Sequence, residues 1–216
     1  QQNWSSATAT LDTDNYWPPS LGIMGFASNK ELTVGTDPQT LLTEDGSANL
    51  LANQTDPAST DPSINTTFGV AEFEMADPVI ALCANPDRDT PSLVFYLNST
   101  TISSTSLIKL SYTLRDIDNS ARNTVQPIAV QYRVGSIGSF TNIPEAFVAD
   151  ATVGPNLTQS VDYNVVLPAE CSNQSALYIR FITAYASNYA DEWVGIDNVK
   201  LEEYLTPVEL SGFDAE

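Results

Sequence analysis

Two predicted β-strands lie in residues 176–204, ALYIRFITAYASNYADEWVGIDNVKLEEY. In the first, the apolar residues Leu177, Ile179 and Phe181 recur at every second position, which is the period of a strand. In the second, residues 193–201, apolar side chains stand on both sides of the alternation, which is typical of a central strand buried on both faces. An acidic turn joins the two strands. We therefore expect the upstream segments to supply the strands that cover this stretch.

Further short alternating segments precede this stretch, and none of the chain has the period of an amphipathic helix. Together they predict about ten short strands with polar turns between them, which indicates an all-β antiparallel sandwich or barrel. The other candidate strands are residues 7–11, 21–26, 66–75, 79–83, 92–97, 105–116, 124–134 and 160–167. Residues 30–62 are rich in turn signals and predict a long surface excursion, with a helical turn near residues 38–42.

The chain has 216 residues and a formal net charge of −19, because Asp and Glu outnumber Lys and Arg by 27 to 8. This charge repels nucleic-acid phosphates and anionic membrane surfaces, so we expect no nucleic-acid partner. No apolar run reaches the roughly 18 residues of a membrane span, so we expect no membrane insertion. The composition is poor in Lys, and the sequence starts with Gln1 rather than Met. Both features predict a secreted chain, extracellular or at the cell surface, from which a signal peptide has been removed.

Two cysteines, Cys83 and Cys171, match no metal-binding spacing, and in an exported chain they predict one long-range disulfide. The alternative is two separate buried thiols. Asn-x-Ser/Thr acceptor sites for glycans also occur, and they predict covalent glycans on a sugar-coated surface. These sites are Asn3, Asn53, Asn65, Asn98, Asn156 and Asn173.

The chain divides into three parts. Residues 1–20 are expected to be an N-terminal extension, residues 21–205 the sandwich, and residues 206–216 a tail strand. The tail reads TPVELSGFDAE, in which apolar and polar residues alternate before Gly212 shifts the phase. The chain is therefore predicted to have a surplus terminal strand.

Several segments in this order resemble the jelly-roll domains of large secreted bacterial surface proteins. They are LRDID (114–118), VQYRVG (130–135), LPAE (167–170), LYIRF (177–181) and DEWVGIDNVKL (191–201). The tail LTPVELSGFDAE resembles the PVEL segment that follows such domains in exported Bacteroidetes-type proteins. The resemblance implies an antiparallel jelly-roll β-sandwich, similar to galactose-binding and carbohydrate-binding modules. It also implies a structural calcium ion and a role in attachment, in a matrix or as a spacer.

Two acidic clusters have the oxygen-rich chemistry that Ca²⁺ prefers, although neither has the spacing of an EF-hand. The candidate metal ligands are Asp116, Asp118, Asp191 and Asp197. A simpler interpretation is that Asp116 pairs with an arginine, and that Asp197 caps a turn. Apart from this structural calcium, we expect no cofactor.

We expect the chain not to be an enzyme. Histidine is absent, which removes the commonest general base. No nucleophile elbow, P-loop or dinucleotide-binding fingerprint occurs. Asp191 and Glu192 are adjacent, so in a strand they would point to opposite faces and could not act together on a glycosidic bond.

Sugar binding is one of the functions that the sequence suggests, because aromatic side chains on one exposed face would stack on sugar rings. The candidates are Trp4, Tyr16, Trp17, Tyr185, Tyr189 and Trp193. The alternative is that they belong to the core, and Trp193 in particular is expected there.

The function predicted first is structural. A surplus strand can complete the sheet of a neighbouring subunit, and such head-to-tail contacts propagate a filament. In this hypothesis Val208, Leu210 and Phe213 enter the neighbour, and the chain is a glycosylated homopolymer in an extracellular fibril or surface layer. The alternatives are a carbohydrate-binding adhesion module that contacts polysaccharide, and a calcium-dependent spacer. The tail could also fold back on its own domain or link to another one.

Overall fold

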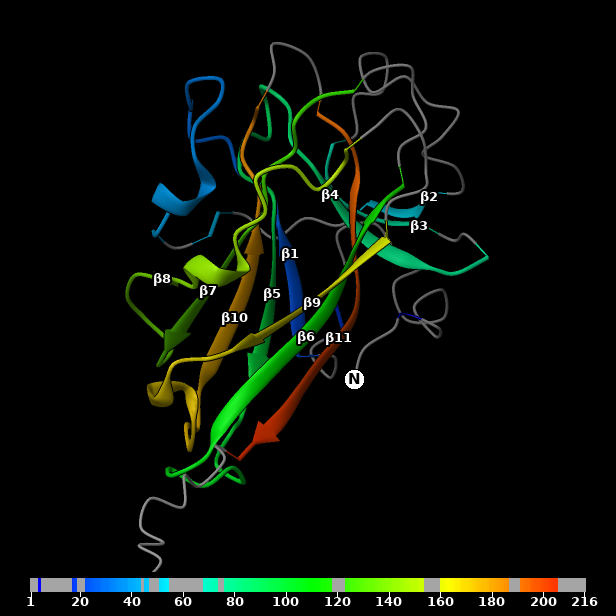
Figure 1. Cartoon of the computed structure of the whole chain (residues 1–216). Coiled ribbons are helices and arrows are strands. Elements are labelled where there is room, and N and C mark those ends of the chain that lie inside the picture. Colours follow the sequence, from blue (N-terminus) through cyan, green and yellow to red (C-terminus); the bar gives the residue numbers. More distant parts are fainter. Residues whose placement is uncertain are drawn as a thin grey trace, which may run out of the picture.

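Two β-sheets packed face to face make up the computed structural model (Figure 1). It describes residues 4, 17–18, 22–43, 45–46, 51–54, 68–73, 76–117, 123–153, 160–186 and 191–205. In sheet order, the five-stranded sheet contains β1 (Ile23–Phe26), β5 (Ser92–Leu97), β10 (Leu177–Ile182), β7 (Ala129–Val134) and β8 (Thr141–Asn142). The six-stranded sheet contains β2 (Leu51–Gln54), β3 (Gly69–Phe73), β4 (Val79–Cys83), β11 (Val194–Tyr204), β6 (Leu107–Asp116) and β9 (Ser160–Val166).

Short 3-10 turns connect some of these strands. They are η3 (Pro38–Thr40), η4 (Pro144–Ala146) and η5 (Ala169–Cys171). Within the described residues, no helix is long and apolar enough to cross a membrane.

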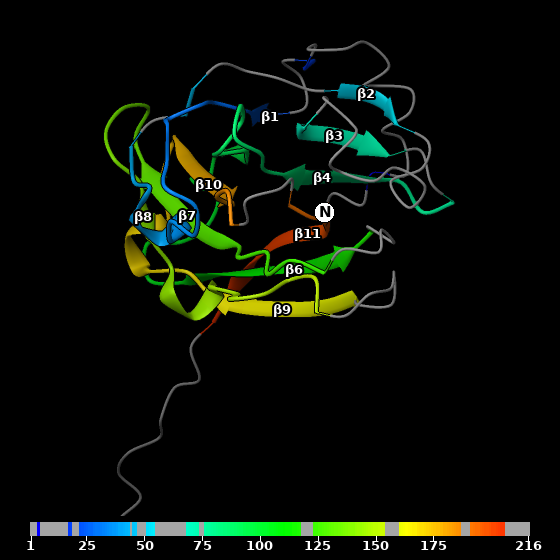
Figure 2. The same ribbon diagram turned by 90° about the horizontal axis from the view of Figure 1, so that it is seen from above.

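The strands pair in the nested order of a jelly roll. β4 pairs with β11, β5 with β10, β6 with β9 and β7 with β8, all antiparallel, so each later strand returns beside an earlier one. Successive pairs belong to the two sheets in turn. Figure 2 shows the sheets from above as two layers. Only β2, at the edge, runs parallel to its described neighbour β3. The predicted antiparallel jelly-roll sandwich is confirmed.

The stretch quoted first supplies the most central strand of each sheet. β10 lies between β5 and β7, and β11 lies between β4 and β6. The two strands belong to different sheets, so they do not pair as a hairpin. Alternation indicates which side of a strand is buried but not which strand lies beside it. The sequence therefore did not reveal that these two strands belong to different sheets.

The core between the layers is built from aromatic rings that reach across it. Phe181 of β10 meets Tyr112 of β6 edge to face, with ring centroids 4.9 Å apart. Phe95 of β5 lies 5.9 Å from Phe181 on one side and 6.4 Å from Trp4 on the other. The Trp4 indole donates its N–H to the carbonyl oxygen of Ile196 at 2.6 Å. This N-terminal tryptophan is therefore part of the interface between the sheets.

A segment that we call the strap, residues 37–43, crosses the outer face of the five-stranded sheet. Arg180 of β10 points out from this face and is fully buried beneath the strap. Its guanidinium donates to the carbonyl oxygens of Leu41 at 2.6 Å and Thr43 at 2.9 Å, and to Asp45 Oδ1 at 2.8 Å. It also lies 3.7 Å above the ring of Phe140. One buried cation thus fixes part of the predicted excursion onto the sheet.

The predicted disulfide is wrong, because both cysteines are free, buried thiols. Cys83 ends β4 beside the C-terminal end of β6, and its thiol donates to the Asp191 carbonyl oxygen at 2.9 Å. Cys171 follows β9 at the opposite end of β6, where the neighbouring Ser172 hydroxyl donates to the Ser106 carbonyl oxygen at 2.7 Å. A ten-residue strand such as β6 is about 30 Å long, whereas a disulfide needs Cα atoms within about 7 Å.

Candidate functional site

Two tyrosines and an arginine form a row across the outer face of the five-stranded sheet. Tyr178 of β10 is directly opposite Tyr96 of β5 on one side and Arg133 of β7 on the other. Directly paired residues share a face of the sheet, and Tyr178 alternates with the buried Ile179, so the row points away from the core. The two tyrosine rings meet edge to face with centroids 4.9 Å apart. The Arg133 guanidinium lies 4.5 Å above the Tyr178 ring.

Beside this row is a hollow of about 180 Å³, which we call the aromatic hollow. It is lined by Phe26, Asp45, Val94, Tyr96, Arg133 and Ser136. Aromatic rings, a guanidinium and a carboxylate thus open onto one space. Ligand sites commonly combine apolar walls with a few polar groups in this way.

Asp45, two residues after the strap, is the only carboxylate among the described residues that line the aromatic hollow. Asp45 Oδ1 accepts hydrogen bonds from Arg180 at 2.8 Å and from the Ser92 hydroxyl at 2.7 Å. Burial raises the pKa of Tyr96 to about 12, with Asp45 adding to the rise and Arg133 opposing it. The Tyr96 hydroxyl is therefore protonated at neutral pH and can both donate and accept hydrogen bonds.

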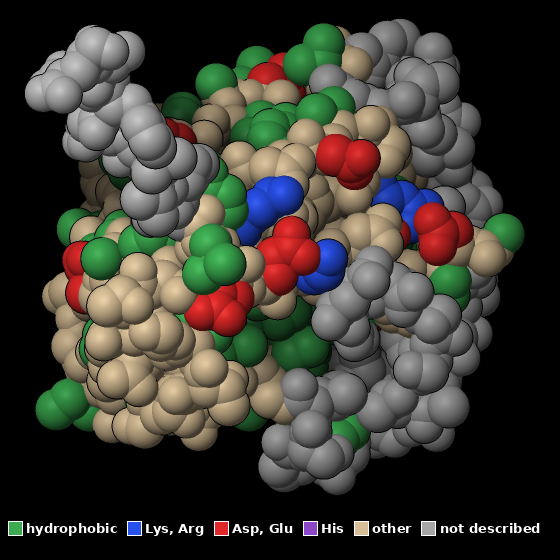
Figure 3. Space-filling view, turned by 60° about the horizontal axis from the view of Figure 1, so that its bottom comes forward, with side chains coloured by type: hydrophobic (Ala, Val, Ile, Leu, Met, Phe, Trp, Pro, Cys, Tyr) green, Lys and Arg blue, Asp and Glu red, His purple; other side chains and the backbone are tan. Residues whose placement is uncertain are grey.

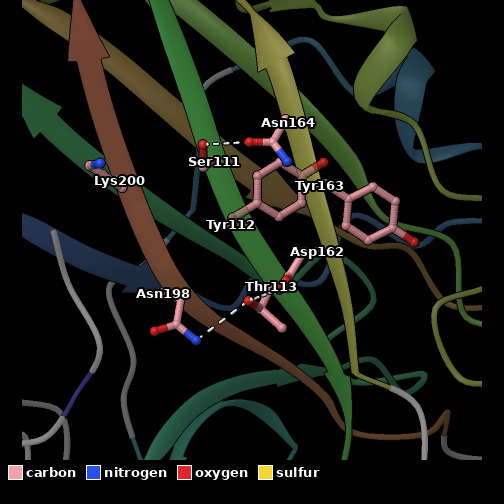
Figure 4. A pocket seen from close by; sticks show the side chains of 8 residues that line it. All are labelled: Ser111, Tyr112, Thr113, Asp162, Tyr163, Asn164, Asn198 and Lys200. Atoms are coloured by element: carbon pink, nitrogen blue, oxygen red, sulfur yellow. Dashed lines mark hydrogen bonds between the residues drawn. The ribbon is translucent and has the colours of Figure 1, made fainter.

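A second hollow, of about 280 Å³, lies on the outer face of the six-stranded sheet, over β9, β6 and β11 (Figure 4). We call it the polar hollow. Its polar side chains are Ser111, Thr113, Asp162, Asn164, Asn198 and Lys200, with Tyr112 and Tyr163 completing the lining. The Ser111 hydroxyl donates to Asn164 Oδ1 at 2.8 Å, and the Thr113 hydroxyl donates to Asp162 Oδ1 at 2.6 Å. The polar groups are therefore held in place across neighbouring strands.

Ion pairs lie on the same sheet face along β11 and β6. Glu202 pairs with Lys109 at 3.6 Å and also with Lys200. Arg115 pairs with Asp197 at 3.0 Å and with Asp77 at 3.1 Å. Figure 3, which brings the bottom of the molecule forward, likewise shows acidic and basic side chains beside one another. Charge on this part of the surface is locally balanced.

The structure separates two of the four predicted metal ligands, Asp116 and Asp197. Asp116 continues the inner-face series of β6 two residues after Leu114, whereas Asp197 pairs with Thr113 on the outer face. The two carboxylates therefore point to opposite sides of one sheet. Asp191 accepts the Ala186 N–H at 2.9 Å, and Asp118 lies outside the described residues. In the described part of the chain, no three His, Cys, Asp or Glu side chains form a group that could hold a metal.

Asp197 instead has the partners of a buried structural carboxylate. It accepts the Arg115 guanidinium at 3.0 Å and the Asn198 N–H at 2.7 Å. Burial raises the pKa of Asp197, and the Asn198 N–H and Arg115 oppose that rise. The arginine partner and the backbone contact satisfy this carboxylate without a metal ion, and calcium binding by the four predicted ligands stays a prediction.

Two of the predicted glycan acceptors, Asn98 and Asn173, are exposed and lie close together. The residues that follow them are linked, since the Gln174 N–H donates to the Ser99 hydroxyl at 2.9 Å. Asn98 Oδ1 accepts both the N–H and the hydroxyl of Thr100, at 3.0 and 2.7 Å. Asn53 belongs to β2. The remaining acceptors, Asn3, Asn65 and Asn156, lie outside the described residues.

Most of the aromatic residues predicted to stack on sugars are in the interior instead. Trp4, Trp17, Tyr185 and Trp193 are 1%, 5%, 6% and 5% exposed. Trp193 packs edge to face on Phe73, with ring centroids 4.9 Å apart. Tyr16 and Tyr189 lie outside the described residues, as do the predicted subunit contacts Val208, Leu210 and Phe213. For the four described residues the interpretation as core residues was correct.

The sequence analysis missed the row of Tyr96, Tyr178 and Arg133, although a local signal was present. Tyr178 alternates with apolar residues in LYIRF, and Tyr96 does so in SLVFYL. The signal that would have identified them is an aromatic residue at an outward-facing position of a strand that is apolar on both faces. Asp45 had no such signal, because its place depends on the contact between the strap and Arg180.

No protein-family model and no curated protein matches the sequence. Among solved structures, the chain is similar to the enzymatically active domain of tailspike protein 4 of bacteriophage CBA120. The two are 11% identical with a TM-score of 0.43, over 94% of this chain but only 21% of that chain. It is also similar to the K3 cleaved adhesin domain of Lys-gingipain from Porphyromonas gingivalis W83. That match has 14% identity and a TM-score of 0.38, over 58% of this chain and 74% of that chain.

A carbohydrate-binding module specific for non-crystalline cellulose, CBM28, is similar over 70% of this chain and 98% of that chain, with 13% identity and a TM-score of 0.39. At these identities and TM-scores, the likenesses carry no argument about what this chain binds.

Proposed function

We propose that this chain is a non-catalytic carbohydrate-binding module whose ligand lies on the aromatic hollow. The observation that supports this most directly is the row of Tyr96, Tyr178 and Arg133 beside the Asp45 carboxylate. As an adhesion module of a secreted surface protein, it would contact polysaccharide outside the cell.

A sugar ring matches the chemistry of this hollow. One face of a pyranose presents C–H groups, which pack on the face of an aromatic ring, while its hydroxyls need hydrogen-bond partners. Phe26 and Tyr96 supply aromatic surface, and both are half-buried, so they keep part of their rings accessible. Arg133 is a donor, and each oxygen of Asp45 has more than one acceptor lone pair. Charged partners strengthen such hydrogen bonds.

The net charge of −19 favours an uncharged ligand. An acidic polysaccharide would be repelled by the protein as a whole, although the repulsion is screened within about 8 Å at physiological salt. We therefore propose a neutral polysaccharide. Its affinity should change little between low and high salt, since stacking and hydrogen bonds to neutral hydroxyls do not depend on screening.

The site lacks the machinery of glycoside hydrolysis within the part of the chain that the structure describes. That reaction needs two carboxyl groups about 5–10 Å apart. Among the described residues lining the aromatic hollow, Asp45 is the only acid, and it is held by Arg180. Binding without cleavage is the activity that these residues support.

Affinity electrophoresis in gels that contain glucan, mannan, xylan or a polyuronate tests this proposal. We expect at least one neutral polysaccharide to retard the wild-type protein, and to retard the Tyr96→Ala and Tyr178→Ala variants much less. Tyr204→Ala is the matched control, because it removes another half-buried tyrosine, on β11 of the other sheet. Equal retardation of the wild type and both row variants would show that the ligand is elsewhere.

A further inference from the structure

The polar hollow lies where β11 is irregular in its pairing with β6. The pairing of β11 with β6 shifts between Asp197 and Lys200. Within that bulge Asn198 has a φ of 51°, a left-handed backbone that asparagine tolerates better than most residues. Bulges re-aim side chains and are enriched beside binding sites. Here the bulge turns an exposed Asn198 amide toward Thr113 Oγ1, at 3.4 Å.

Existing hydrogen bonds fix the orientation of these polar groups and leave capacity for a ligand. Ser111 donates to Asn164 Oδ1, so the two N–H groups of the Asn164 amide lie on its other side. Thr113 donates to one oxygen of Asp162, and a carboxylate can accept about four hydrogen bonds. Asp162 and Asn164 are both exposed on the edge strand β9. The hollow thus offers amide donors and carboxylate acceptors side by side.

No ring stacking is available in this hollow from its two tyrosines. Tyr112 and Tyr163 stack on each other with centroids 5.2 Å apart and planes 15° apart. The Tyr112 hydroxyl donates inward to the Ala146 carbonyl oxygen at 3.3 Å. Both rings are therefore committed to the inner side of the sheet. Recognition in the hollow must depend on hydrogen bonds.

The charged side chains of β6 and β11 beside the hollow are already paired, and the Asp162 carboxylate within it accepts the Thr113 hydroxyl. Lys200 and Lys109 pair with Glu202, and Arg115 pairs with Asp197. A charged ligand would have to compete with these pairs, whereas a neutral ligand rich in hydroxyl groups would not. Hydroxyl groups both donate and accept, which matches the mixed character of the hollow.

We infer that the polar hollow is a second saccharide site, so that the domain binds neutral glycan on both of its sheets. This inference rests on the proposed function for the class of ligand, but it concerns different residues. The two hollows lie on the outer faces of opposite sheets, so one domain can hold two glycan chains apart from each other. Two linked sites increase avidity for a polymer by effective concentration, without any new contact.

Isothermal titration with a neutral hexasaccharide tests the inference, using the sugar that retards the protein most in affinity gels. The wild type should bind two molecules per chain. The double variant Tyr96→Ala/Tyr178→Ala should keep one weaker site. Adding Thr113→Val/Asn164→Val to it should remove that site, with at least a tenfold loss of affinity. These valines preserve strand propensity while deleting the polar groups. Ser160→Val, an exposed change on β9 outside the hollow, is the control.

The outcomes separate the two claims. A stoichiometry of one that disappears in the tyrosine variant leaves the proposed function intact and overturns the second site. A stoichiometry of one that survives the tyrosine changes and disappears with Thr113→Val/Asn164→Val supports the polar hollow and overturns the aromatic one. An affinity in the polar hollow unchanged by Thr113→Val/Asn164→Val also overturns the inference. Absence of binding to every sugar overturns both claims.

Discussion

Arg180 and Asp45 form an ion pair, Nη1 to Oδ1 2.8 Å, which joins the middle of β10 to the residue that completes the aromatic hollow. Their side chains are only 0% and 10% exposed. Burial lowers the pKa of Arg180, and Asp45 opposes this effect. The same arginine therefore holds the strap on the sheet and keeps the Asp45 carboxylate in the proposed site.

Replacing Arg180 by Met should destabilise the fold by about 3–5 kcal/mol, because it leaves Asp45 and two strap carbonyl groups without their buried donor. The free energy of unfolding from urea titration measures this. The matched control is Lys109→Met, which breaks an exposed ion pair with Glu202 and should cost at most about 1 kcal/mol. A loss of that small size in the Arg180 variant would mean that the strap does not depend on the ion pair.

Replacing Arg133 by Lys should weaken glycan binding about tenfold, although the positive charge is kept. The planar guanidinium lies over the Tyr178 and Phe140 rings, 4.5 Å from each centroid, and a lysine ammonium cannot reproduce this stacking or the fork of donors. Isothermal titration calorimetry with the same neutral hexasaccharide measures the affinity, and the melting temperature checks the fold. Unchanged affinity in Arg133→Lys would show that the arginine does not orient the sugar.

The fold should lose stability at alkaline pH. Burial raises the pKa of Tyr96 and Tyr132 from 10.0 to about 12, and that of the Cys171 thiol from 9.0 to about 12. The folded state therefore holds these protons more tightly than the unfolded state. This stabilisation is fully present below about pH 9 and is lost as the pH rises toward about 12.

Urea midpoints should hold between pH 8 and about pH 9 and then fall up to pH 11.5, and Tyr132→Phe should flatten part of the decline because it removes one of the titrating groups. A flat profile would contradict the pKa directions given above.

Both cysteines should react as thiols once the chain is unfolded. In guanidinium chloride without reductant, a colorimetric thiol assay should count two thiols per chain, and in the native state both should react slowly. The slow reaction follows from burial, which raises the pKa of Cys171 and so keeps it protonated. A reductant should leave the melting temperature unchanged. A count of zero would establish the disulfide that the sequence suggested.

Deleting residues 206–216 tests the hypothesis of a fibre subunit. We expect the free energy of unfolding to change by less than about 1 kcal/mol, because β11, the last strand that the structure describes, ends at Tyr204. If electron micrographs of the full chain show filaments, the deletion should abolish them, since Val208, Leu210 and Phe213 are the predicted connectors. Filaments that persist without the tail would place the connection elsewhere.

Local alternation predicted most of the strands. The alternating segment 160–167 nearly coincides with β9, because a period of two is a property of each strand by itself. The short apolar segments 79–83 and 92–97 coincide with β4 and β5. Partner choice is a long-range property, and this is why the separation of β10 and β11 into different sheets was not predicted. The prediction of a disulfide was wrong for the same reason, since only the strand pairing places the two cysteines at opposite ends of β6.

The candidate site was less predictable than the fold. Tryptophans were candidates because their rings can stack on sugars, yet Trp4 is buried in the core between the sheets. Tyr96 and Tyr178 are ordinary strand residues until the strand pairing makes them neighbours. Asp45 enters the site through a hydrogen bond to a residue 135 positions away, and no local pattern reports a contact of that kind.

The position of β11 has a consequence for how the chain folds. This last strand lies between β4 and β6, so without it the six-stranded sheet falls into the two unconnected pieces β2-β3-β4 and β6-β9. The sheet therefore cannot close before the chain has been synthesised through Tyr204. Such high contact order slows folding, and the edges of β4 and β6 stay open to other strands until β11 pairs with them.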